Sequence, residues 1–178
     1  MKMKHPNYDY LNFLDYTTIS VTGLQPALDF IDDRLEEDIK DLIREKNIYI
    51  INSIGPGCIF DNVCLNDNEK IGHLIIIDKT LTWDLLKFNP TEIAAEILHE
   101  IGHVINKPDN SQGENIEFYA DDFAIACQFS AQLKSGLEKY KNVISHFSGK
   151  TSDSPFFKDL KKQKQIMDLL DLRIKRIA

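Results

Sequence analysis

Hydrophobic and polar positions along this chain predict a mixture of helices and strands. From residue 24 to about 46, apolar side chains recur at helical spacing with acidic residues between them, which predicts an amphipathic helix. A second helical pattern covers 89–106, and a third runs from 115 to about 133, with a continuation through Gly136 to 147 left open. Three short apolar runs bounded by turn-forming residues predict strands at 47–54, within 58–65 and at 71–78.

The helix expected at 89–106 has recognisable signals at both ends. Asn89 is a favourable N-cap residue, Pro90 suits the first helical position, and Glu92 stands where the acid of a capping box belongs. The sequence Asn106-Lys107-Pro108 is expected to end the helix. The residues between these signals therefore have predictable helix faces.

Inside that helix lies the pentapeptide His99-Glu100-Ile101-Gly102-His103, which has the form H-E-x-x-H. Residues four apart share a helix face, so both imidazoles can reach one ion, and zinc binds such nitrogen ligands at about 2.0–2.1 Å. Glu100 then lies beside the ion without binding it, where a carboxylate can take a proton from a zinc-bound water. The motif predicts one Zn²⁺ held by His99 and His103, with Glu100 as the general base of a hydrolysis.

A catalytic zinc usually takes a third protein ligand, and Glu117 is the favoured candidate. It lies in the next expected helix, four residues before Asp121, so these two carboxylates share a face. Asp121 would accept the second N–H of a liganding histidine and fix its tautomer. Glu114 and Asp122 are rivals for the ligand role, although Glu114 is close to the helix start and Asp122 points about 100° away from Asp121. The small Ala120 would let the two helices approach closely.

The segments HEIGH and EFYADDFA together resemble the gluzincin metallopeptidases. The likeness is closest to the branch of HtpX-like and CAAX-prenyl-endopeptidase proteins, whose pattern is HExxH followed by ExxxD. It covers roughly residues 70–130 and includes a strand, a leucine-containing turn and a helix before the motif. ImmA/IrrE-like regulatory peptidases, which carry a similar E-x-x-A-x-x-F-A segment, are the next-nearest match, but the position of Asp121 favours the first branch.

The resemblance implies an α+β fold. The expected architecture is a zincin-like (gluzincin) domain whose small mixed β-sheet packs on the HExxH helix and on the Glu-bearing helix that follows. The resemblance also implies zinc bound by His99, His103 and Glu117, with Glu100 as general base and Asp121 behind a liganding histidine. In gluzincins a rim strand pairs with an extended substrate, so substrate backbone is expected beside residues 73–78.

Composition limits the kinds of partner and the cellular location that we expect for this protein. The chain has 178 residues, 43% of them hydrophobic, so one domain with a proper core is expected. A net charge of −7 argues against sequence-independent binding to the phosphates of nucleic acid. No run of 18 or more apolar residues predicts a transmembrane segment, and the N-terminus lacks an apolar signal core, which favours a cytoplasmic location.

The three cysteines form an odd and sparse set. Cys58 and Cys64 are close enough in sequence to meet, but a cytoplasmic location favours reduced thiols. We expect both, and Cys127, to be structural.

We expect residues 1–147 to form a single metallopeptidase domain that includes the N-terminal amphipathic helix. A hydrophilic segment at 148–155 separates a basic helix from about 156 to 177, so that 148–178 is a linker and a C-terminal helix packing on the domain. The acidic helix at 24–46 is the expected counterpart of this basic helix. Contact with a partner or a membrane is the other option for it.

Three functions compete at this point. The leading one is a soluble zinc-dependent metalloendopeptidase that acts on a peptide or protein substrate. The second is a regulatory peptidase that cuts one specific partner, and the third is a non-catalytic, zinc-stabilised interaction module. A peptidase also needs a donor for the developing oxyanion besides zinc, and Tyr119, Tyr140 and His146 are conceivable donors.

Overall fold

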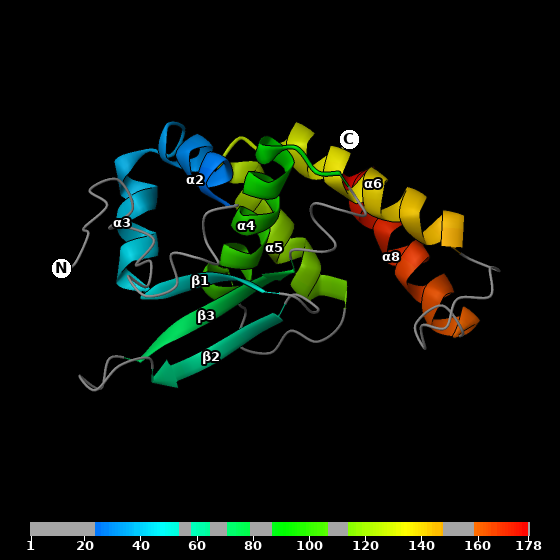
Figure 1. Cartoon of the computed structure of the whole chain (residues 1–178), viewed down its shortest axis with the longest axis horizontal. Helices are drawn as coiled ribbons and strands as arrows, with labels where there is room; N and C mark the ends of the chain where they lie inside the picture. Colours follow the sequence, from blue (N-terminus) through cyan, green and yellow to red (C-terminus); the bar gives the residue numbers. More distant parts are fainter. Residues whose placement is uncertain are drawn as a thin grey trace.

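The computed structural model describes residues 24–53, 58–64, 71–78, 87–106, 114–147 and 159–177, which form a small sheet and a group of helices (Figure 1). The elements are α2 (Gln25–Asp32), α3 (Glu37–Glu45), β1 (Ile48–Ser53), β2 (Cys58–Cys64), β3 (Ile71–Asp78), α4 (Pro90–Ile105), α5 (Glu114–Ala126), α6 (Ser130–Phe147) and α8 (Leu160–Ile177). Among the described residues, no helix combines the length and the apolar character needed to cross a membrane.

Several expectations fall on residues outside these ranges. They concern the irregular segment before residue 24, the turns between the strands, and the hydrophilic segment at 148–155. The division of the chain into 1–147 and 148–178 stays a prediction, as does the zincin-like fold class.

The three strands form one mixed sheet in the order β1-β3-β2. β1 runs parallel to β3, with Ile48 opposite His73, and β2 runs antiparallel to β3, with Cys64 opposite Ile71. All three strands occur where the sequence predicted them. Since Cys58 and Cys64 are the two end residues of β2, about 20 Å of extended chain separates them, and they cannot form a disulfide with each other.

The central position of β3 overturns one expectation. Its residues 73–78 pair with β1 on one side, and its residues 71–76 pair with β2 on the other. The main-chain groups that an extended substrate would use are therefore taken over most of this strand. The expectation that substrate pairs beside residues 73–78 was wrong, because an apolar strand buried between two neighbours is not a rim strand.

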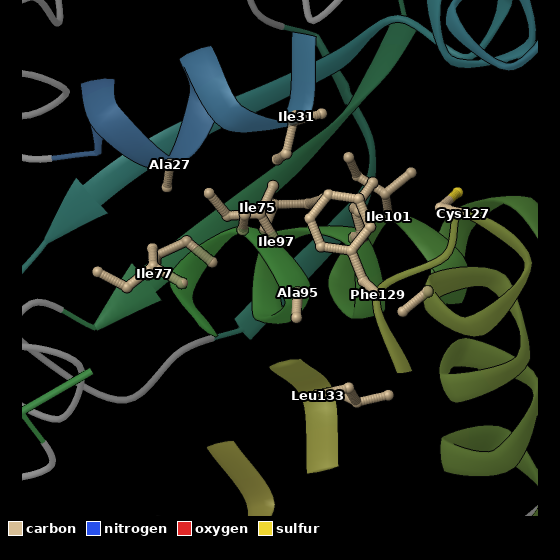
Figure 2. Close-up of a cluster of buried hydrophobic side chains, with 14 of the residues drawn as sticks. Ala27, Ile31, Ile75, Ile77, Ala95, Ile97, Ile101, Cys127, Phe129 and Leu133 are labelled. Carbon is tan, nitrogen blue, oxygen red and sulfur yellow. The ribbon is translucent and has the colours of Figure 1, made fainter. Parts of the chain in front are cut away.

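The core lies between the sheet and the helices, with α4 in its middle (Figure 1). Figure 2 shows side chains of three elements meeting there, together with the residue that precedes α6: Ile31 of α2, Ile75 of β3, Ile97 and Ile101 of α4, and Phe129. Each of these five side chains is fully buried. The buried face of α4 thus anchors the helix that carries the H-E-x-x-H motif.

Two helices replace the single one predicted over 24–46. α2 and α3 are separated by a short break, in which Glu36 has extended backbone (φ −69°, ψ 153°). A continuous helix would place Asp32 and Glu36 four residues apart, where like charges destabilise it. Across the break Lys40 pairs with Asp32 at 3.0 Å, in addition to Glu37 of its own helix at 3.1 Å. The prediction of one continuous helix followed the apolar spacing alone and was wrong.

A turn also separates α5 from α6, so the long helix predicted there ends early. Gln128 has left-handed backbone (φ 67°), the N–H of Phe129 donates to the carbonyl of Ala124 (3.0 Å), and the N–H of Gln128 donates to that of Ile125 (2.9 Å). These two bonds define a Schellman turn. Glycine usually occupies the left-handed position, so a glutamine gives no sequence signal, and it costs roughly 1–2 kcal/mol. Burial of Phe129, whose ring meets Phe30 edge-on at 5.5 Å, offsets that cost.

The C-terminal helix α8 packs against α6 and α5. Two of its arginines pair with acids of α5: Arg173 with Asp121, and Arg176 with Asp122. The acidic segment at 24–46 was therefore the wrong counterpart. Overall charge suggested it, whereas the observed pairs depend on which acids lie on the adjacent helix.

Candidate metal centre

The motif lies in the middle of α4, whose two ends are fixed as predicted. Asn89 Oδ1 accepts the backbone N–H groups of Thr91 (2.9 Å) and Glu92 (3.0 Å), and the Glu92 carboxylate accepts the backbone N–H of Asn89 (2.8 Å). This confirms the capping box. At the other end, the Asn106 N–H donates to the carbonyl of Gly102 (2.8 Å). His99, Glu100 and His103 are therefore held within a well-anchored helix.

A close approach between α4 and α5 brings the two halves of the site together. A Cβ atom added to Gly102 would lie 2.6 Å from the carbonyl oxygen of Ala120 and 2.9 Å from Cβ of Phe123. Only glycine allows this backbone separation, and Ala120 on the opposite helix is completely buried. The expectation that Ala120 permits close packing is confirmed, and Gly102 is its partner within the motif.

Three potential metal ligands converge across this contact. His99, His103 and Glu117 each offer a donor atom, and these atoms all lie within 4.8 Å of one another. Nε2 of His99 is 3.3 Å from Oε2 of Glu117, and Nε2 of His103 is 3.7 Å from Oε1 of the same carboxylate. Ligands bound tetrahedrally at about 2.0–2.1 Å lie roughly 3.3–3.4 Å apart. The group could hold a metal ion.

Asp121 lies directly behind His99, as the sequence predicted. Its Oδ1 is 2.9 Å from Nδ1 of His99, and the aspartate is completely buried. A carboxylate in this position accepts Nδ1–H, which leaves Nε2 facing Glu117 and His103. The imidazole is thereby oriented with Nε2 toward the other two donors.

The sequence reasoning missed Arg173 of α8, which extends into this cluster. Its Nε lies 2.9 Å from Oδ2 of Asp121, its Nη2 lies 2.7 Å from Oδ1 of Asp121, and its Nη1 lies 3.0 Å from Oε2 of Glu117. Nη2 also lies 3.1 Å from Nδ1 and 3.3 Å from Nε2 of His99. Since Nδ1 donates to Asp121, we regard the approach to Nδ1 as a close contact and not as a hydrogen bond.

A signal for Arg173 was present in the sequence. Leu170, Arg173 and Ile177 follow at helical spacing, so the arginine occupies the apolar stripe of α8. It is only 8% exposed. A charged residue at a buried helix position needs a partner of opposite charge, and here that partner, Asp121, lies 52 residues earlier in the chain.

The two histidines have opposite pKa shifts. For His99, burial and the Arg173 cation lower the pKa, but hydrogen bonds to Asp121 and Glu117 outweigh them and raise it to about 9. For His103, burial and the positive charge of His99 lower the pKa to about 4. One imidazole is thus protonated and the other neutral at pH 7, and a metal ion would have to displace the proton from His99.

The two glutamates of the cluster differ in the same way. Burial raises the pKa of Glu100 to about 7; the His99 charge opposes this rise, and the charges of Glu96 and Glu117 add to it. Burial also acts to raise the pKa of Glu117, but the hydrogen bond to His99 and the Arg173 cation outweigh it and lower the pKa to about 2. Carboxyl groups with pKa values driven apart in one site are typical of acid–base chemistry.

Of the two rival ligands, Asp122 is paired with another residue, and the side chain of Glu114 is not among those that the structure describes. Asp122 pairs with Arg176, whose Nη2 lies 2.7 Å from Oδ2 of Asp122. The side chain of Glu114 lies outside the described residues. Of the acids considered in this helix, the structure places Glu117 with the histidines.

The three conceivable oxyanion donors are spread over the molecule. Tyr119 is 42% exposed, the ring of Tyr140 packs edge-on against Phe88 at 5.3 Å, and His146 is exposed in the last turn of α6. The cation that the structure brings to the cluster is Arg173. Cys127, expected to be structural, is a free and buried thiol, and burial raises its pKa to about 12.

Comparisons with known proteins leave the geometry as the basis for any functional conclusion. No protein-family model, no curated protein and no solved structure matches this chain. The resemblance to gluzincins stays a prediction from the motif residues.

Proposed function

We propose that this protein is a zinc-dependent metalloendopeptidase of the gluzincin type. His99, His103 and Glu117 would hold the zinc ion, and Glu100 would act as general base. The observation that carries the proposal is the convergence of two imidazoles and one carboxylate from two helices, with their donor atoms within 4.8 Å. Two nitrogen ligands and one oxygen ligand suit catalytic zinc, which keeps a further position for water.

The chain's own residues supply the remaining chemistry. When bound, zinc would polarise the scissile carbonyl and lower the pKa of the attacking water toward about 7. Glu100 would accept a proton from that water and pass it to the leaving amine, and its raised pKa suits both transfers at neutral pH. Asp121 would accept the Nδ1–H of His99, which turns Nε2, the nitrogen that would bind zinc, toward the other two donors.

The decisive experiment compares zinc content and peptide cleavage in the full chain and in Glu100→Gln. We expect the wild type to cleave a generic peptide library and to lose this activity with a chelator. Glu100→Gln should retain zinc by elemental analysis and lose on the order of 10²- to 10⁴-fold in turnover. Glu96→Gln is the matched control, because it makes the same change one helical turn earlier and should lose only a few-fold.

Each other outcome supports a different function. Zinc binding without any cleavage would favour the non-catalytic interaction module. Cleavage of a single co-purified protein, with none of the library, would favour the regulatory peptidase. Full activity of Glu100→Gln would remove Glu100 from the role of general base. A cytoplasmic location stays a prediction from the sequence.

A further inference from the structure

The C-terminal helix α8 contributes a residue to the metal centre. We propose that Arg173 is a positioning residue: it holds Asp121, and through Asp121 it holds His99, in the orientation that metal binding requires. This inference rests on the proposed function, since it concerns the same three donors. It assigns to α8 a part in building the site, beyond covering the domain.

The contacts of Arg173 favour Asp121 over the donor atoms. Two of its nitrogens bind the two oxygens of Asp121, at 2.9 Å and 2.7 Å, whereas the nearest donor, Oε2 of Glu117, lies at 3.0 Å. A planar guanidinium that binds both oxygens of one carboxylate fixes its orientation as well as its position. These two hydrogen bonds from the guanidinium therefore determine where Oδ1 of Asp121 lies.

That oxygen is also the one that meets His99. Oδ1 of Asp121 lies 2.9 Å from Nδ1 of His99, so Arg173 and His99 share one acceptor. The ring orientation that leaves Nε2 facing Glu117 depends on this contact. An Asp121 carboxylate without Arg173 could rotate and release the imidazole from the orientation that brings Nε2 within 3.3 Å of Glu117.

Burial makes the arginine necessary. Asp121 is completely buried and Arg173 is 8% exposed, so neither charge is solvated to a useful extent. A buried carboxylate without its cation would be driven toward solvent. That movement would remove the acceptor that His99 needs.

An opposing effect has to be weighed, because a guanidinium repels a metal cation. If repulsion dominated, loss of Arg173 would strengthen zinc binding. The charge of Arg173 is, however, paired with two carboxylates, those of Asp121 and Glu117, and of these two only Glu117 belongs to the donor group. The paired guanidinium therefore presents little net charge to the ion, and we expect the loss of orientation to dominate.

The coupling is reciprocal. If docking of α8 through Arg173 strengthens metal binding, then bound metal must stabilise the docking of α8 by the same factor. The chain segment that the sequence suggested as an addition to the domain would then be required for a complete site.

The test measures the zinc dissociation constant of the full chain by competition with a chromophoric chelator at fixed pH. We expect Arg173→Met to bind zinc on the order of 10- to 100-fold more weakly than the wild type. Arg176→Met is the matched control, because it removes an equal charge from α8 and a similar pairing with α5 but no contact to the donors. Its affinity should stay within about threefold of wild type, as expected for an exposed ion pair.

A conservative variant separates geometry from charge. Arg173→Lys keeps the positive charge but loses the planar guanidinium that binds both oxygens of Asp121. A positioning role therefore predicts a zinc affinity between those of Arg173→Met and the wild type. If Arg173→Met does not fold, Arg173→Lys still allows the comparison with the wild type. The visible spectrum of the Co²⁺-loaded protein, which reports ligand geometry, should change in Arg173→Met and not in Arg176→Met.

A double-mutant cycle checks that Arg173 acts through Asp121. We expect Arg173→Met combined with Asp121→Asn to bind zinc about as weakly as the weaker single variant, because the two residues form one unit. Tighter or unchanged zinc binding in Arg173→Met, wild-type affinity in Arg173→Lys, or additive losses in the cycle would each overturn the positioning role. Failure of the wild type to bind zinc would instead overturn the proposed function, and this inference with it.

Discussion

Two carboxylate clusters lie along α4, and they differ in how completely their charges are matched. In the first turn, the Glu92 carboxylate accepts the backbone N–H of Asn89 (2.8 Å), the hydroxyl of Ser135 (2.6 Å) and the ammonium of Lys139 (2.5 Å). One negative charge meets one positive charge, and each bond joins α4 to its own cap or to α6. This arrangement is what a purely structural polar cluster requires.

The cluster in the middle of α4 is not balanced in this way. Two positive charges, on Arg173 and on protonated His99, interact there with the carboxyl groups of Glu96, Glu100, Glu117 and Asp121. The pKa values of its two glutamates, about 7 and about 2, are far apart. The comparison teaches that a buried carboxylate alone is no sign of function, whereas an excess of acids around paired imidazoles indicates a place for a cation.

The largest expected effect comes from making the same substitution in both clusters. Glu117→Gln removes a charged donor and should weaken zinc binding by about 100-fold or more, measured by chelator competition. Glu92→Gln should leave the zinc affinity within about twofold, because its carboxylate binds Lys139 and Ser135 and no donor. Equal losses in the two variants would show that the clusters are not separate.

A second substitution tests the packing that joins the donors. Gly102→Ala would bring a methyl group within 2.6 Å of the Ala120 carbonyl, so α4 and α5 must separate. We expect a loss of about 1–3 kcal/mol in the free energy of unfolding. Zinc affinity should fall as well, because Glu117 moves away with α5.

Gly136→Ala provides the control for that substitution. Its added Cβ would lie 3.4 Å from the ring of Phe88, an acceptable contact, and alanine favours a helix by up to about 1 kcal/mol over glycine. We expect equal or greater stability in denaturant unfolding and wild-type zinc affinity. A similar loss in both variants would mean that Gly102 has no special role in the helix contact.

The smallest expected effect concerns stability as a function of pH. Burial acts to raise the pKa of Glu92, but the bonds from Lys139, Ser135 and Asn89 outweigh it and lower the pKa. The stabilisation from such a carboxyl is fully present above its unfolded value, about 4.3, and is lost as pH falls through the lower folded value. Glu92→Gln should therefore cost about 1–2 kcal/mol at pH 7 and progressively less below pH ~4. A deficit that stays constant down to the lowest pH at which the chain folds would contradict this account.

The local parts of the site were predictable from the sequence. The capping box at Asn89 and Glu92 and the shared faces of His99 with His103 and of Glu117 with Asp121 follow from helix geometry alone. The structure brings these residues together as the spacing predicted.

What could not be predicted depends on contacts between distant segments. The left-handed backbone at Gln128 becomes favourable only because Phe129 is buried against Phe30, almost 100 residues earlier. Arg173 meets Asp121 only because α8 lies on α5. The central position of β3, which overturned the expected substrate rim, follows from strand order, which alternation of residues does not encode.

The turn at Gln128 has a consequence for two places along α4. It lets one stretch of chain deliver Glu117 to the middle of α4 from α5, and Lys139 to its first turn from α6. Inserting or deleting one residue within α5 or α6 beside this turn would shift the rest of that helix by about 100° about its axis. Either Glu117 or Lys139 would then point away from α4, so the number of helical residues on each side of the turn sets the phase between the two clusters.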